Sequence, residues 1–197
     1  MKNFQAKFIT SVADASKFYY DGRPLIAISG KSNVGKSSLI NMLAGNKKLA
    51  KTSDTPGRTR LINYFDFGEF VLADLPGYGY AKVSAKEKAK WAELLEEFFA
   101  TQDISLLVAL FDIRHAPTAD DKQMVSYLYA NAIPFTAVAT KADKLPKTKV
   151  KPQLVAVAAD LRLGVADMIA SSAENGAGRD VIFAAIKKAI AVRAENA

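Results

Sequence analysis

The sequence predicts an α/β protein: one domain built on a six-stranded, mostly parallel sheet with helices on both faces. Three observations predict this fold. Short apolar runs alternate with segments of helical periodicity, which is the pattern of βαβ units. The chain has 197 residues, 50% of them apolar, which is enough for one ordinary core. A glycine-rich turn at residues 30–37 joins an apolar run to a helical pattern, as phosphate-binding loops do.

The strands are expected in six apolar runs of the chain. Only Gly68 and Glu69 separate the second run from the third, which is too short for a crossover, so these two should form an antiparallel hairpin. The others are separated by helical segments and should be parallel. The expected strands are Leu25–Ser29, Leu61–Phe67, Phe70–Asp74, Ile104–Asp112, Phe135–Thr140 and Val165–Ala170.

Five segments carry a helical pattern, and a short stretch from Leu145 to Pro152 resembles a loop. No Pro/Gly-rich linker divides the sequence. We therefore expect residues 1–22 to be an N-terminal extension that packs on, or leads into, a domain of residues 23–197. The expected helices are Lys36–Ala44, Lys86–Ala100, Ala119–Ala130, Lys151–Asp160 and Arg179–Glu195.

The composition excludes several protein classes. The chain has no cysteine, which excludes a disulfide framework, a thiolate zinc site and a cysteine nucleophile. Charged residues make up 24% of the chain, which argues against disorder. The longest strongly apolar run, Ile104–Phe111, is too short to cross a bilayer, and no signal segment is visible. We expect a soluble, cytoplasmic domain.

Residues 30–37 fit the pattern Gly, four residues, Gly-Lys-Ser. The glycines let the backbone turn its N–H groups toward an anion at a helix start, where the helix dipole also favours negative charge. Lys36 should reach the β- and γ-phosphates of a nucleotide, and the Ser37 hydroxyl should bind Mg²⁺. The alternative is a plain strand-to-helix turn. The expected nucleotide contacts are Gly30, Lys31, Ser32, Asn33, Val34, Gly35, Lys36 and Ser37.

Residues 140–143, directly after an apolar strand, fit the (N/T)KxD pattern that selects guanine. The Asp143 carboxylate can accept from both the N1–H and the exocyclic amine of guanine, whereas adenine presents an acceptor at N1. Alone, this match is weak and a surface Lys–Asp pair would explain it. Its position after the phosphate loop and a strand strengthens it. The expected base contacts are Thr140, Lys141, Ala142 and Asp143, with Ser171, Ser172 and Ala173 of a later loop.

Residues 74–77 end the third strand as a DxxG element. Asp74 should hold Mg²⁺ through a water, and the Gly77 N–H should contact the γ-phosphate. A second magnesium-binding hydroxyl is expected before the second strand, where Thr59 is the candidate and Thr55 its competitor. The expected nucleotide contacts of this element are Asp74, Leu75, Pro76 and Gly77.

These motifs, in this order, resemble those of translation-factor-type GTPases. Pro56–Arg60 resembles the switch segment of Era-like GTPases, and Asp74–Lys82, with Trp91 and Asp112–His115, resembles the EngB group (also called YihA or YsxC). The resemblance covers about residues 23–190 and implies a single P-loop GTPase domain that binds GTP or GDP with Mg²⁺. It makes Thr59 a magnesium ligand beside Ser37 and Asp74. It also adds Gly57, Arg58, Thr59, Arg60 and Leu61 to the nucleotide contacts.

The resemblance also implies a cellular role and partners. Members of this family are linked to assembly of the large ribosomal subunit and to normal septation, so that subunit and its rRNA are the expected partners of a monomer. Residues 47–60 and 141–151 each carry five basic residues against one acidic, and residues 82–90 carry four against one. Segments 47–60 and 82–90 flank Thr59 and residues 74–77, so we expect this face to bind rRNA in the GTP state, although solvated charge would also explain these segments. The rival functions are an ATP-using kinase, which Lys141 and Asp143 oppose, and a division-site scaffold.

One catalytic residue of many GTPases is missing. Where they place a glutamine that orients the attacking water, this chain has Tyr78, so hydrolysis should be slow, on the order of 10⁻⁴ to 10⁻² s⁻¹. We expect catalysis from Lys36, Thr59 and Asn33, the last by holding K⁺ against the phosphates as the matching Asn does in some Era-like relatives. The alternative is that Asn33 only tolerates an unusual backbone angle. His115 fits a loop hydrogen bond or a partner contact better than a general base.

Overall fold

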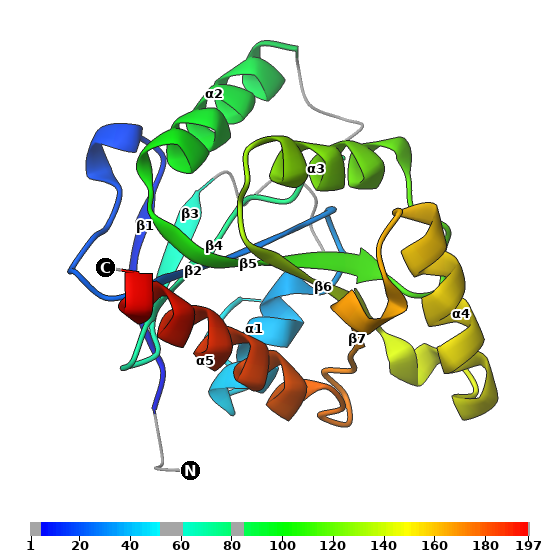
Figure 1. Ribbon diagram of the computed structural model, residues 1–197. Helices are drawn as coiled ribbons and strands as arrows, with labels where there is room; N and C mark the ends of the chain where they lie inside the picture. The colour runs from blue at the N-terminus through cyan, green and yellow to red at the C-terminus, as the bar shows by residue number, and fades with distance from the viewer. Residues whose placement is uncertain (1–4, 52–60, 80–84, 197) are drawn as a thin grey trace.

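The computed structural model describes residues 5–51, 61–79 and 85–196, which form one sheet covered by helices on both faces (Figure 1). This is the α/β architecture predicted from the alternation of strands and helices. Along the sheet, the strands follow the order β1 (Lys7–Val12), β3 (Ile62–Asp66), β4 (Val71–Asp74), β2 (Leu25–Gly30), β5 (Ile104–Asp112), β6 (Phe135–Thr140) and β7 (Met168–Ala170).

The strand directions agree with the prediction. Strands β4, β2, β5, β6 and β7 are parallel, while β3 pairs antiparallel with β4 through the short turn at Gly68 and Glu69. Central strand β2 is buried along its whole length, as expected for a parallel sheet covered on both faces. The carboxyl ends of these parallel strands therefore meet at one edge, where ligands bind in open α/β sheets.

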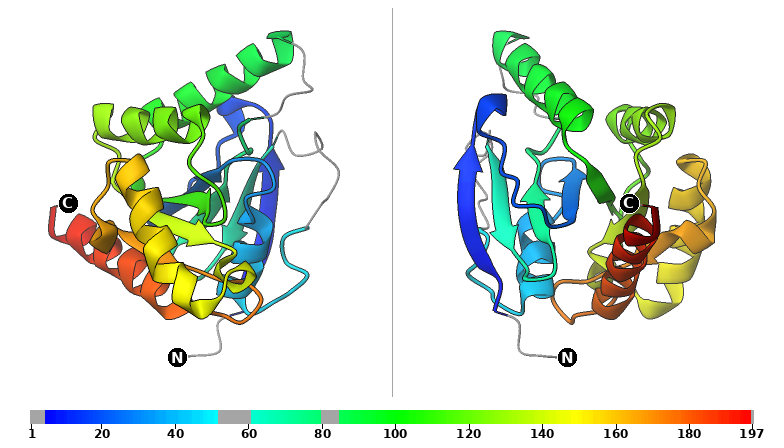
Figure 2. Two further views of the ribbon diagram at one scale, coloured as in Figure 1. Left: turned by 90° about the vertical axis from the view of Figure 1, so that its right-hand side faces the viewer. Right: turned by 60° about the vertical axis from the view of Figure 1, so that its left-hand side comes forward.

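The helices form two layers, one on each face of the sheet (Figures 1 and 2). On one face, α1 (Lys36–Ala44) and α5 (Arg179–Asn196) bury Leu39, Ile40, Ile182 and Ile186 against the sheet. The other face carries α2 (Ala85–Thr101), α3 (Ala119–Ala130) and α4 (Lys147–Asp160), whose buried residues include Phe98, Leu128 and Val157. No helix in the described part of the chain is long and apolar enough to span a membrane.

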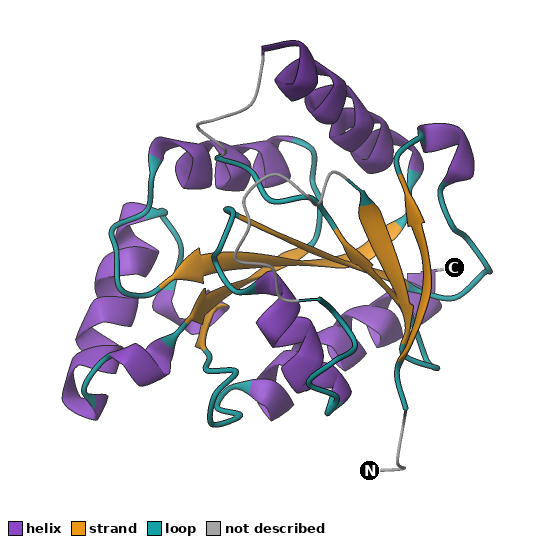
Figure 3. Ribbon diagram, turned by 180° about the vertical axis from the view of Figure 1, so that it is seen from behind, coloured by secondary structure: helices purple, strands orange, loops and turns teal. Residues whose placement is uncertain are grey.

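The sheet has seven strands rather than the predicted six. The additional strand, β1, lies at the edge and pairs antiparallel with β3 (Figure 3). Only its last residue, Val12, is buried, so β1 lacks the long apolar run that marks the other strands. An edge strand gains its stability from backbone pairing with a neighbour distant in sequence, which a local pattern does not reveal. Part of residues 1–22 is thus built into the sheet.

The last strand is shorter than the sequence predicts. Residues Val165–Asp167 form a 3₁₀ turn, and the chain pairs with β6 only from Met168 to Ala170. All three residues of the turn are exposed, whereas Met168 is buried. The apolar character of Val165 and Ala166 therefore does not reflect a place in the sheet, and only the second half of the expected strand is correct.

Helix α4 begins at Lys147, inside the stretch expected to be a loop, and contains Pro152. Val150, which lies inside the expected loop, packs against the core beside Leu154, and this contact accounts for the earlier start of the helix. Tertiary packing supplies most helical stability in proteins, and here it outweighs the hydrogen bond that proline removes.

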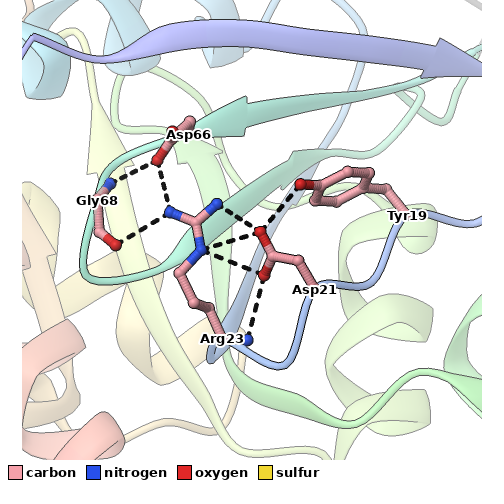
Figure 4. A network of polar contacts seen from close by, with 5 residues as sticks. All are labelled: Tyr19, Asp21, Arg23, Asp66 and Gly68. Carbon is pink, nitrogen blue, oxygen red and sulfur yellow. Dashed lines mark hydrogen bonds and ion pairs between the residues drawn. The ribbon is translucent and has the colours of Figure 1, made fainter.

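A polar network ties the segment before β2 to the β3–β4 hairpin (Figure 4). The Arg23 Nη1 donates to Asp66 Oδ1 at 2.6 Å and to the Gly68 carbonyl oxygen at 3.0 Å, while its Nε donates to Asp21 at 3.0 Å. The Tyr19 hydroxyl donates to Asp21 at 2.9 Å. Hydrogen bonding from Arg23 lowers the pKa of Asp21 to about 2, so this carboxylate is charged at neutral pH. The network holds the entry to the strand that carries the phosphate loop.

Candidate nucleotide-binding site

The phosphate loop runs from the end of β2 to the start of α1. Gly35 is the N-cap of α1 and has a left-handed backbone with φ of 109°, which a residue with a side chain would adopt only under strain. No described side chain caps this helix, and its first turn contains no acidic residue. The first N–H groups of α1 are therefore available to an anion, at the end of the helix where the dipole favours negative charge.

The other end of α1 is fixed by α5. Arg179 Nε and Nη2 donate to the carbonyl oxygens of Met42 and Leu43, each at 3.0 Å. The bond to Leu43 satisfies a carbonyl group that the end of a helix otherwise leaves unpaired, while the Met42 carbonyl oxygen also accepts from the Gly45 N–H at 3.2 Å. The helix that presents Lys36 and Ser37 is thus anchored at the end opposite the phosphate loop.

Lys36 and Asp74 form the charged centre of the site. Burial lowers the pKa of Lys36, and the nearby charge of Asp74 opposes this shift. Burial raises the pKa of Asp74 to about 6, opposed by the Lys36 charge and a hydrogen bond from Asn63. Asp74 is the last residue of β4, so the parallel pairing of β4 with β2 brings it to the same sheet edge as the phosphate loop.

The Asp74 carboxylate fits a hydrated magnesium ion. Its Oδ1 atom is buried and has no hydrogen-bond partner among the described residues, a costly state that a cation-bound water would relieve. Ser37, the neighbour of Lys36, supplies an oxygen of the kind that Mg²⁺ prefers. Thr59, the third expected ligand, lies outside the described residues.

The predicted guanine segment is bonded directly to the phosphate loop. The Thr140 hydroxyl lies 2.7 Å from the Val34 carbonyl oxygen, and Lys141 Nζ donates to the Asn33 carbonyl oxygen at 2.7 Å. The Lys141 backbone is left-handed, with φ of 61°, where the chain turns out of β6. These bonds join segments that are 106 and 108 residues apart in the sequence. The two motifs therefore form one site.

Asp143 lines a cavity of about 210 Å³ beside the phosphate loop. The Ser172 hydroxyl donates to Asp143 Oδ1 at 2.7 Å, and this hydrogen bond lowers the pKa of Asp143. The carboxylate is therefore ionised at neutral pH, as an acceptor for the two guanine N–H groups must be. The cavity is lined by Gly35, Ser38 and Leu39, by parts of segment 140–144 and by parts of segment 171–174.

Asp112 also belongs to the site. In the sequence it contributes only to the resemblance to the EngB group, and no role is predicted for it. Its Oδ2 atom accepts from Lys141 Nζ at 2.9 Å and from Arg114 Nη2 at 2.7 Å. Burial would raise the pKa of Asp112, but the bonds from Arg114 and Lys141 hold it below its usual range. Asp112 pairs in register with Thr140 at the ends of β5 and β6, a neighbourhood that the parallel topology could have indicated.

The structure brings the phosphate loop, residues 74–77, 140–143 and 171–173 to one edge of the sheet. Five expected or competing site residues lie outside the described part of the chain: Thr55, Gly57, Arg58, Thr59 and Arg60. Leu61 is described, and it is half-buried just before β3. Asn33 has a φ of 62°, which is the unusual backbone angle expected if the residue serves only the loop geometry. Its potassium-binding role stays a prediction. His115 is exposed in the loop after β5.

Comparison with known proteins agrees with this geometry. The family model described as "50S ribosome-binding GTPase" matches residues 25–141. A probable GTP-binding protein EngB of Streptococcus thermophilus is 46% identical over 151 residues, which is 76% of each chain. The corresponding protein of Geobacillus kaustophilus is 40% identical over 185 residues, which is 92% of this chain and 95% of the relative.

Solved structures show the same fold. A crystal structure of a probable GTP-binding protein EngB superposes with a TM-score of 0.69 at 21% identity, covering 84% of this chain and 98% of that one. Era in complex with MgGDPNP and a 16S rRNA fragment also gives a TM-score of 0.69, at 24% identity over 86% of this chain and 57% of Era. The chain thus belongs to the EngB family and is a GTP-binding protein with a GTPase domain.

Proposed function

We propose that this protein is a slow, magnesium-dependent GTPase that acts as a switch in assembly of the large ribosomal subunit. It works in the cytoplasm, and normal cell division and septation depend on it. The joined phosphate loop and guanine cavity carry the nucleotide part of this proposal. The ribosomal part is supported by the family description and by the rRNA-bound Era structure, and the septation part by the resemblance to EngB proteins.

Hydrolysis in this site depends on positioning and on charge stabilisation. Ser37, Asp74 and Thr59 would hold Mg²⁺, which when bound neutralises charge on the β- and γ-phosphates. Lys36 and the N–H groups at the start of α1 would bind the same oxygens. The Tyr78 hydroxyl donates to Asp121 at 2.8 Å and is therefore not free to orient water, which supports a slow rate.

A basic surface lies beside the guanine cavity. Residues 144–159 carry four lysines and no acidic residue, and Lys144 lines the cavity itself. Lys147, Lys149 and Lys151 are exposed at the start of α4, and none of them forms an ion pair with a described residue. Exposed lysines that form no ion pair with a described residue suit the phosphate backbone of RNA, which binds with release of counterions.

Two lysines of the basic segment 47–60 lie away from the phosphate-binding end of α1, while residues 52–60 of that segment lie outside the described part of the chain. Its first lysines, Lys47 and Lys48, follow the end of α1. A nine-residue helix spans about 13 Å, so these lysines lie well away from the phosphate-binding end. We therefore assign the RNA-facing role first to Lys147, Lys149 and Lys151.

Sedimentation with large ribosomal subunits tests this proposal. Binding should be stronger with a non-hydrolysable GTP analogue than with GDP, and should fall steeply with salt. The Lys147→Glu/Lys149→Glu double variant should weaken binding and reduce the log–log salt slope by roughly 0.7–0.9 for each RNA phosphate that a lysine no longer neutralises. Its GTP affinity should be unchanged, because neither residue contributes to the cavity lining.

The matched control is Lys187→Glu/Lys188→Glu, which makes the same charge change at two exposed lysines of α5. It should bind like the wild type. Lys82→Glu/Lys86→Glu tests segment 82–90 separately; Lys82 lies outside the described residues, and only the helical backbone of Lys86 is described. Salt-insensitive association that ignores the nucleotide would contradict the proposal and favour the scaffold function.

Potassium should accelerate GTP hydrolysis relative to sodium at equal ionic strength. The proposed reason is that the Asn33 side chain, which is exposed in the phosphate loop, holds the ion against the phosphates. Asn33→Ala should then remove the difference between the two salts, as measured by phosphate release under single-turnover conditions. Equal wild-type rates in the two salts would leave Asn33 with the loop-geometry role alone.

A further inference from the structure

Tyr78 connects the DxxG element to two other parts of the molecule. Its carbonyl oxygen accepts from the Ser32 N–H of the phosphate loop at 2.9 Å. Its hydroxyl donates to Asp121 Oδ1 at 2.8 Å, in the first turn of α3. Tyr78 and Asp121 are only 8% and 7% exposed, so this hydrogen bond is shielded from water.

Asp121 is itself held in a fixed orientation. Its second carboxylate oxygen, Oδ2, accepts from the Thr118 backbone N–H at 2.8 Å and from the Thr118 hydroxyl at 2.7 Å. This is the capping box at the start of α3. With Oδ2 occupied, Oδ1 is left to Tyr78, and the tyrosine ring is fixed relative to the helix.

The Gly77–Tyr78 backbone covers the groups that should meet a γ-phosphate. A Cβ atom on Gly77 would lie 2.8 Å from Lys36 Nζ and 3.1 Å from the Ser32 nitrogen, so the backbone lies directly on both. The Ser32 N–H is already used by Tyr78. The phosphates of GDP need only the N–H groups at the start of α1. The γ-phosphate of GTP also needs the space beside Ser32 and Lys36 that the Gly77–Tyr78 backbone covers.

We propose that the Tyr78–Asp121 hydrogen bond is a latch that keeps Gly77 and Tyr78 on the phosphate loop and thereby favours GDP over GTP. Asp121 is a positioning residue, since it acts through Tyr78. GTP has to displace the Gly77–Tyr78 backbone from Ser32 and Lys36, and the latch opposes that displacement. The latch rests on the proposed guanine-nucleotide switch, but it does not depend on the ribosomal partner.

The latch predicts the direction of a change in nucleotide preference. A ligand shifts a conformational equilibrium only through its different affinity for the two states, so weakening the closed state should help GTP and leave GDP nearly unchanged. Tyr78→Phe keeps the ring and removes only the hydroxyl. Because the bond is buried and its acceptor is a carboxylate, the GTP-to-GDP affinity ratio should rise about tenfold.

Equilibrium titration with fluorescent GDP and a fluorescent non-hydrolysable GTP analogue measures this ratio. Thr118→Ala is the control, because it removes the hydroxyl bond of the same cap, while the Thr118 backbone N–H still holds Asp121 Oδ2 and the Tyr78 hydroxyl bond stays in place. It should lower thermal stability without changing the ratio. An unchanged or lowered ratio in Tyr78→Phe, or an equal rise in Thr118→Ala, would overturn the latch.

A second measurement needs no variant. In the wild type, amide hydrogen exchange of the peptide around residues 118–122 should be faster with the GTP analogue than with GDP, because release of Tyr78 leaves Asp121 with one partner fewer. Equal exchange in the two states would also overturn the latch. Failure of ribosome sedimentation would instead contradict the proposed function and leave these nucleotide measurements standing.

Discussion

Replacing Lys36 by alanine should abolish tight binding of both GDP and GTP. The Lys36 ammonium group is largely buried near the Asp74 carboxylate, and it supplies positive charge where the phosphates are expected to bind. In the nucleotide complex Lys36 would pair with phosphate oxygens, and removing one partner of such a charge pair costs several kcal/mol, so the Kd for either nucleotide should rise by at least about a hundredfold. Equilibrium titration with fluorescent GDP and a GTP analogue measures the loss.

The site itself supplies a graded comparison. Ser37→Ala should weaken nucleotide binding mainly when magnesium is present. It removes a hydroxyl proposed to hold the ion, but it removes no charge from the phosphate site. Lys187→Ala, at an exposed position of α5, should bind both nucleotides normally. If Lys36→Ala bound GTP with wild-type affinity, the placement of the phosphates at residues 30–37 would be wrong.

The structural features of the candidate site that the sequence predicts are those encoded by contiguous residues. Gly35 must adopt a left-handed backbone, and Lys36 must begin a helix, so both requirements appear within eight letters of sequence. The segment at Asp143 is similar, because a strand end places it at the sheet edge without further information. Fold class follows for the same reason, since helical and strand periodicities are local.

The features that the sequence does not predict depend on contacts between distant segments. The edge strand β1 forms through pairing with β3, about fifty residues away, and its own pattern is half exposed. Asp112 gains its role from Lys141, which is 29 residues distant. Tyr78 stands where many GTPases have a catalytic glutamine. Only the structure shows that its hydroxyl donates to Asp121 in α3 instead of facing the phosphates.

Replacing Asp143 by asparagine should change the preferred base from guanine to xanthine. The Ser172 hydroxyl donates to Asp143 Oδ1, so an asparagine should keep its carbonyl oxygen at that position and turn its amide N–H₂ toward the base. The amide can donate to the 2-oxo group of xanthine, where guanine has a donor of its own. A mismatched buried donor costs about 1–3 kcal/mol, and sites built on such hydrogen bonds discriminate strongly. The GTP-to-XTP affinity ratio should therefore fall by at least about a hundredfold.

The matched control makes the same chemical change at a carboxylate that holds Lys141 rather than the base. Asp112 Oδ2 lies 2.9 Å from Lys141 Nζ, so Asp112→Asn should make the position of that lysine less fixed. The affinities for GTP and XTP should both fall, and the preferred base should stay guanine. Lys144, whose Nζ lies 3.0 Å from Asp143 Oδ2, is on an exposed side chain that can swing away when a base enters. Competition between GTP and XTP for the two variants separates base reading from lysine positioning. An Asp143→Asn protein that still prefers GTP to XTP would show that another residue reads the base.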